Sequence, residues 1–162
     1  MSTWVIDAGP LLFLAKLERL VLLHRNATVL VPEAAYIETQ QHNDDAAFVI
    51  AEAAHTWLKV RSIRNQGAVR LLLADLDLGE AEAIVLAEES KADRLILDDM
   101  DARRFAHRVG FVVIGTVGLL LSARLRGEIP SLRAEIERLE QFGFWISPDL
   151  VSQVLHTAGE NE

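Results

Sequence analysis

The sequence contains no cysteine among its 162 residues. That absence excludes a disulfide-stapled scaffold, a thiolate zinc or iron–sulfur site, and a cysteine nucleophile. No apolar run reaches the roughly 18 residues that a membrane-spanning helix needs. The N-terminus has no basic segment followed by a long apolar stretch, so we expect no secretory signal. These absences lead us to expect a cytoplasmic protein that has no membrane partner.

Positive charge is also scarce. Lys and Arg number 16 against 24 Asp and Glu, which gives a formal net charge of −8. Proteins that coat nucleic acid nonspecifically are usually basic, so bulk charge does not hold this chain to nucleic acid. Activity on nucleic acid would therefore need a local device, such as a metal ion that inverts the field around a group of acids.

Several catalytic motifs are missing as well. The sequence has no GxGxxG or GxxxxGK[ST] phosphate-binding loop, no GxSxG nucleophile turn and no HExxH zinc motif. Its five histidines show no paired i, i+4 spacing. Common nucleotide folds, serine hydrolases and helical zinc sites therefore lose support.

What the chain does have is enough apolar material for a core, 51% of its residues. Short apolar runs predict strands over 4–6, 28–31, 57–63, 94–97, 111–114 and 143–146, with 57–63 at an edge. Helical spacing predicts helices after Asp7 and over 17–23, 32–41, 44–54, 67–74, 78–90, 101–109, 116–125, 131–141 and 148–155. Strands that alternate with helices predict an α/β fold, a three-layer α/β/α sandwich around a mainly parallel sheet. We expect a single domain over 1–162 with a helical C-terminal extension from about residue 124.

Acidic residues follow several of these elements, where the carboxyl ends of parallel strands gather ligands and reactive groups. Two positions come directly after strands, and the others lie on the helices that follow: Asp7, Asp98 with Asp99, Glu38, and Glu80 with Glu82. Hard oxygen ligands of this kind suit Mg²⁺ or Mn²⁺. Like charges that converge should raise the pKa of at least one carboxyl group.

Each acid also has a plainer interpretation. Asp7 is a reasonable helix N-cap, and one acid of the Asp98-Asp99 pair can cap the next helix. Glu80 lies in a first helical turn, where the helix dipole alone favours an acid. Residues 80 and 82 are about 200° apart around a helix, so at most one of them faces a given pocket.

The ordered pattern resembles the PIN-domain family of metal-dependent ribonucleases, and within it VapC-like proteins. The segments that carry the resemblance, in chain order, are VIDAGPL at 5–11, VPEAAYIE at 31–38, LGEAEAI at 78–84, LILDD at 95–99 with ARR at 102–104, GTVGLL at 115–120 and GFWIS at 143–147. They cover nearly the whole chain, and the ordered set is more specific than any single segment.

The resemblance implies phosphodiester hydrolysis of RNA by a site of four acids. It places the catalytic acids at Asp7, Glu38, Glu82 and Asp98, with Glu82 standing where the toxins usually carry Asp. Metal ligands are implied at Asp7, Glu82, Asp98 and Asp99, and the implied cofactor is Mg²⁺ or Mn²⁺. Substrate binding is expected from Arg103, Arg104 and Thr116. Thr116 could instead hydrogen-bond a carboxylate that holds the metal, and it is also explained as a helix N-cap.

The implied partners are the RNA substrate and, for a toxin, an antitoxin protein; the apolar helices also favour a homo-oligomer. The main alternative is a non-catalytic PIN-like module that binds RNA or a partner protein. A response-regulator receiver domain is weaker, because it needs an acidic pair after the first strand. A dehalogenase-like hydrolase needs a second Asp at the position of Gly9.

Overall fold

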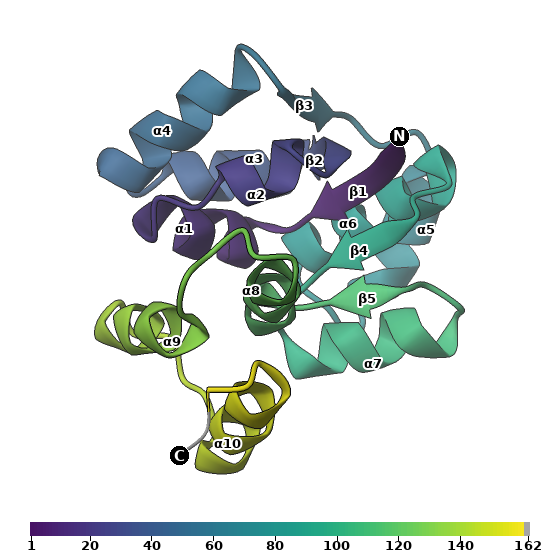
Figure 1. Cartoon of the computed structure of the whole chain (residues 1–162). Helices are drawn as coiled ribbons and strands as arrows, with labels where there is room; N and C mark the ends of the chain where they lie inside the picture. The colour runs from purple at the N-terminus through teal and green to yellow at the C-terminus, as the bar shows by residue number, and fades with distance from the viewer. Residues whose placement is uncertain (161–162) are drawn as a thin grey trace.

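The computed structural model describes residues 1–160 and is built on one sheet of parallel strands. The strands are β1 (Ser2–Ile6), β2 (Ala27–Pro32), β3 (Leu58–Arg61), β4 (Arg94–Ile96) and β5 (Val113–Ile114), in the spatial order β3-β2-β1-β4-β5. Every neighbouring pair is parallel. The chain therefore starts in the middle of the sheet, adds β2 and β3 on one side, and returns to add β4 and β5 on the other (Figure 1).

Helices cover both faces of the sheet. They are α1 (Ala8–Lys16), α2 (Val21–His24), α3 (Glu33–Gln40), α4 (Asp45–Ala54), α5 (Gln66–Leu72), α6 (Leu78–Ser90), α7 (Met100–Arg108), α8 (Thr116–Leu125), α9 (Leu132–Gln141) and α10 (Pro148–Thr157). In Figure 1, α5, α6 and α7 lie on one side, while α1, α8, α9 and α10 lie on the other. The three-layer sandwich predicted from the sequence is confirmed.

Two separate cores hold these layers together, because successive residues of a strand point to opposite faces. In β1, Trp4 and Ile6 enter the core beneath α1, α4, α8, α9 and α10. Val5, between them, enters the core shared with α5, α6 and α7. Burial on both faces explains why the central strands read as continuous apolar runs rather than alternating ones.

Most of the predicted elements are present, and α6 and α8 have the predicted bounds. β3 lies at an edge of the sheet, as predicted. The predicted helix over 17–23 is interrupted, because Glu18 adopts a φ of 60° and α2 begins only at Val21.

The predicted strand over 143–146 is wrong. Gly143 has a φ of 94° and ends the turn after α9, and the residues that follow lead directly into α10. Their apolar side chains are used in packing: Ile146 is buried, and the Phe144 ring stands edge-on against Phe13 with 4.9 Å between ring centroids.

Within residues 1–160, no helix is both long enough and apolar enough to cross a bilayer.

Candidate active site

Two of the predicted acids lie at the carboxyl ends of neighbouring strands. Asp7 follows β1 directly, and its backbone N–H donates to the carbonyl of Ile96 at 3.1 Å. Asp98 follows the adjacent strand β4 by one residue. Because all strands run the same way, these side chains emerge at one edge of the sheet.

Asp7 occupies the N-cap position of α1, but its side chain makes no capping hydrogen bond. Its Oδ1 is buried and has no hydrogen-bond partner anywhere in the described residues. A buried acceptor that lacks a partner costs on the order of 1–3 kcal/mol, so capping does not account for this side chain. The atom instead has the properties of a ligand position.

The space in front of Asp7 is bordered by Gly79, on the first turn of α6. A Cβ at residue 79 would lie 3.1 Å from Asp7 Oδ1, 3.5 Å from Glu38 Oε1 and 3.6 Å from Asp77 Oδ1. Three carboxylates from separate segments therefore lie within 4 Å of a single point. Glycine leaves that point empty, and a Cβ there would crowd Asp7 Oδ1.

Asp77 and Glu80 form a capping box at the start of α6. Asp77 Oδ1 accepts from the Glu80 backbone N–H at 2.8 Å, and Glu80 Oε1 accepts from the Asp77 backbone N–H at 3.1 Å. Glu80 is buried as a result. Sequence reasoning missed Asp77, although the D-x-x-E spacing of a capping box was available as a signal.

These acids raise one another's pKa. Burial raises the pKa of Asp7 to about 7, and the charges of Asp77, Glu38 and Glu80 add to the effect, while a hydrogen bond from the Ala8 backbone opposes it. Burial is also the main reason why the pKa values of Glu38 and Glu80 are raised, followed in Glu38 by the charge of Asp77. The expected rise in carboxyl pKa is present, but desolvation contributes more to it than repulsion does.

The Asp98 carboxylate accepts two hydrogen bonds from the first residue of α8. Thr116 is fully buried, and it donates its backbone N–H to Asp98 Oδ1 at 2.7 Å and its hydroxyl to Oδ2 at 2.6 Å. Burial raises the pKa of Asp98, although both Thr116 bonds and the charge of Arg103 act against it. Thr116 therefore orients the Asp98 carboxylate, which is the alternative to substrate binding that the sequence offered for it. Its interpretation as a helix N-cap is wrong, because Gly115 is the N-cap of α8.

Glu82 and Asp99 each accept a backbone hydrogen bond at the start of a helix. Glu82 Oε1 accepts from the Ala34 backbone N–H at 3.0 Å, at the start of α3, so its carboxylate satisfies that helix end. Asp99 caps α7 and accepts from the Ala102 backbone N–H at 3.0 Å. On α6, the acid whose charge acts on Asp7 is Glu80. Glu82 in turn lines one cavity with Glu38 and Gly79, so its role as a ligand stays a prediction beside that of Glu80.

The two predicted arginines differ in their surroundings. A Cβ at Gly115 would lie 2.9 Å from Asp98 Oδ1 and 3.2 Å from an Nη of Arg103, so this guanidinium borders Asp98. Arg104 lies further out and pairs with the exposed Asp101 at 3.4 Å.

The acids are near one another without being gathered into a finished metal site. Among residues 1–160, no three His, Asp or Glu side chains are already arranged to hold an ion.

Comparison with known proteins identifies the family of this chain. A family model described as "PIN domain" matches residues 3–160, nearly the whole chain, and the protein belongs to that family. Its members are generally nucleases and typically use divalent metals. The fold is similar to that of a PilT N-terminus domain protein from the hyperthermophilic archaeon Sulfolobus solfataricus. The two share 23% sequence identity with a TM-score of 0.54, over 75% of this chain and 92% of that one. No curated protein matches.

Proposed function

We propose that this PIN-domain protein is a metal-dependent ribonuclease that hydrolyses phosphodiester bonds in RNA. The observation that carries the proposal is Asp7 Oδ1, a buried carboxylate oxygen without a partner that faces the carboxylates of Glu38 and Asp77 across the space left by Gly79. The choice of RNA rests on the resemblance of the sequence to VapC-like PIN proteins.

The residues fit Mg²⁺ or Mn²⁺. Both ions prefer carboxylate oxygens as ligands. Asp7 Oδ1 is such an oxygen, and it has no hydrogen-bond partner within the described residues. We assign Asp7, Glu38, Glu80 and Asp98 as the residues that would hold the ion, directly or through water. When bound, a divalent ion neutralises charge on the scissile phosphate and lowers the pKa of a bound water.

The chain's own groups have separate tasks at this site. Thr116 fixes both oxygens of Asp98, so that carboxylate is presented in one orientation. The raised pKa of Asp7 means that, without a nearby positive charge, its carboxyl group holds a proton up to about pH 7. Arg103, beside Asp98, supplies a guanidinium at the rim that can bind a phosphate oxygen of the substrate.

The test is cleavage of a labelled RNA by the purified chain. We expect cleavage with Mn²⁺ or Mg²⁺, none with EDTA, and a loss of roughly a hundredfold or more in Asp98→Asn. Asp149→Asn is the matched control, since it makes the same change at an exposed position on α10. Equal cleavage with and without metal, or no cleavage of any RNA, would leave the non-catalytic binding module as the better assignment.

A toxin role, with an antitoxin partner and a homo-oligomeric toxin, is the biological setting that the VapC resemblance supports. Expression of the chain in a host cell should then arrest growth, and expression of Asp98→Asn should not. Growth arrest by both the wild-type chain and Asp98→Asn would mean that toxicity does not depend on the acidic site.

A further inference from the structure

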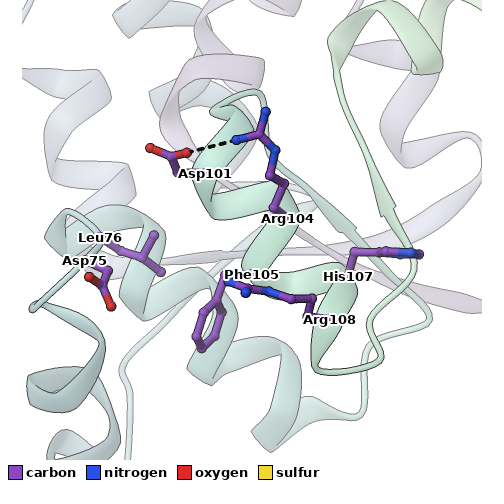
Figure 2. Close-up of a pocket in the computed structure, with 7 residues that line it drawn as sticks. All are labelled: Asp75, Leu76, Asp101, Arg104, Phe105, His107 and Arg108. Carbon is purple, nitrogen blue, oxygen red and sulfur yellow. Dashed lines mark hydrogen bonds and ion pairs between the residues drawn. The ribbon is translucent and has the colours of Figure 1, made fainter.

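A cavity lies between α7 and the segment that joins α5 to α6. Its volume is about 570 Å³. Asp75 and Leu76 form one wall, and α7 supplies the other with Arg104, Phe105 and Arg108 (Figure 2). His107 also borders this cavity, but its side chain points to the other side of the helix (Figure 2).

Two opposite charges line this cavity without meeting. Within residues 1–160, the Asp75 carboxylate and the Arg108 guanidinium take part in no ion pair of 4.0 Å or less, and both residues are exposed. Arg104 is paired with Asp101, but the side chains are 67% and 81% exposed, so this contact is weak and exchangeable. The cavity therefore offers a free hydrogen-bond acceptor opposite free donors.

The types of side chain match a nucleobase better than a phosphate. Asp75 and Asp101 offset the charge of Arg104 and Arg108, so the walls provide no net attraction for an anion. Bases in single-stranded RNA stack on aromatic rings and guanidinium planes and are read by hydrogen bonds along their edges. Phe105 and Arg108 are three residues apart on α7 and so share a face, which Asp75 faces across the opening.

We propose that this cavity is a guanine-binding subsite for single-stranded RNA, an inference that rests on the proposed ribonuclease function for its substrate class. Guanine has two neighbouring N–H donors on its pairing edge, which match the two oxygens of the Asp75 carboxylate. Its O6 and N7 acceptors match a guanidinium, the most common specific contact that arginine makes with a base. No other RNA base presents both patterns.

The location connects the subsite to the bond that would be cleaved. Leu76 immediately precedes Asp77, which borders the acidic site, and α7 begins directly after Asp98 and Asp99. Arg108 lies about 13 Å along the helix axis from Asp99, at the usual rise per residue. A strand whose phosphate lies at Asp7 and Asp98 would therefore place a neighbouring base at this cavity.

The test measures base binding without catalysis. The isotope-labelled full chain, kept in EDTA, is titrated with the four nucleoside monophosphates while its amide NMR signals are followed; ribose 5-phosphate serves as the probe for phosphate alone. We expect guanosine monophosphate to shift the amides of Asp75, Leu76, Phe105 and Arg108 at lower concentration than the other three nucleotides. Ribose 5-phosphate should not shift them.

Variants localise the effect. Asp75→Asn and Arg108→Ala should each weaken binding of guanosine monophosphate by about tenfold, the effect of one lost two-bond contact. Arg25→Ala is the matched control: this arginine is exposed, as Arg108 is, and it lies just before β2, at the amino end of that strand and outside the cavity lining. It should leave binding unchanged.

Equal shifts with all four nucleotides or with ribose 5-phosphate, shifts confined to other residues, or unchanged binding in both variants would overturn the subsite. Because no cleavage is measured, failure of the ribonuclease proposal gives a different result, namely guanosine monophosphate binding by a chain that cuts no RNA with Mn²⁺. Cleavage of RNA by a chain that shows no base binding here would overturn only the subsite.

Discussion

The acids around α9 and those at the carboxyl edge of the sheet have opposite surroundings. Around α9, Glu135 and Glu160 each have an arginine partner. Glu135 is 3% exposed and accepts from Arg19 Nε at 2.8 Å and from Arg138 at 3.3 Å. Glu160 accepts from Arg124 Nε at 2.7 Å and from the backbone N–H of Leu132 at 2.7 Å, at the start of α9.

At the carboxyl edge of the sheet, the acids face one another instead. Asp7 has a pKa of about 7, whereas the pKa of Glu160 is about 2, because hydrogen bonds from the Arg133 and Leu132 backbone and from Arg124 outweigh the effect of burial. One end therefore gains stability from its acids and the other loses it. Unfavourable groups of this kind are typical of functional sites, which is consistent with the proposed metal site.

The largest effect is expected from removing one charge at the carboxyl edge of the sheet. Glu80→Gln should lower Mn²⁺-dependent RNA cleavage by roughly a hundredfold, while Glu82→Gln should change it little. Glutamine preserves the capping box at residue 80 and the acceptor for the Ala34 N–H at residue 82, so both variants should fold. A side-by-side assay with equal melting temperatures decides, and the reverse ranking would restore Glu82 as the ligand.

The second prediction concerns stability without metal. The pKa of Asp7 rises from its ordinary 3.8 to about 7 on folding, so the folded state binds the proton more tightly and loses stability as pH rises through this range. Asp7→Asn should therefore be more stable than wild type at pH 8, by on the order of 3 kcal/mol. Urea unfolding in EDTA should show the difference shrinking towards pH 4. A variant less stable than wild type at pH 8 would contradict the argument.

The third prediction addresses the paired end. Glu135→Gln removes the charge that holds Arg19 and Arg138, and should cost about 2 kcal/mol, because both arginines are partly exposed and can recover water. For a chain of this length that lowers the melting temperature by about 4 to 8 °C. Glu137→Gln, exposed on the same helix, is the control and should cost almost nothing. Equal melting temperatures for the two variants would mean that the Glu135 pairs add no stability.

The fold was predictable because its signals are local. Apolar strands bounded by Asp or Pro mark β1, β2 and β4, and a capping-box spacing marks the start of α6. The prediction of a strand over 143–146 was wrong, because a short apolar run packs equally well as a connector between helices. An extended run becomes a strand only where a neighbour is free to pair with it.

The site was predictable only in part. Asp7 and Asp98 follow strands, a position that is readable in the sequence. The orientation of α6 was not readable, because Gly79–Ala87 is buried almost all round except at Glu82, and the helix has no apolar stripe to fix its rotation. Glu80 and Asp77 also have complete local explanations as capping residues, which concealed their position beside Asp7.

The smallest expected effect tests whether the C-terminal end is stabilised by charge. The pKa of Glu160 falls from its ordinary 4.5 to about 2, so its stabilising contribution is present above pH 4.5 and is lost as the pH falls towards 2. Glu160→Gln should cost about 1 kcal/mol at pH 7, less than the full shift would indicate, because the Arg124 side chain is 31% exposed to screening solvent. Glutamine keeps one oxygen that can accept from the Leu132 N–H, but its NH2 group cannot accept from the Arg133 N–H. The exposed Glu140→Gln is the control. Urea unfolding at falling pH should bring wild type and Glu160→Gln together, whereas Asp7→Asn and wild type separate as pH rises. A gap for Glu160→Gln that persists below pH 3 would mean that shape, and not charge, joins the C-terminal segment to α9.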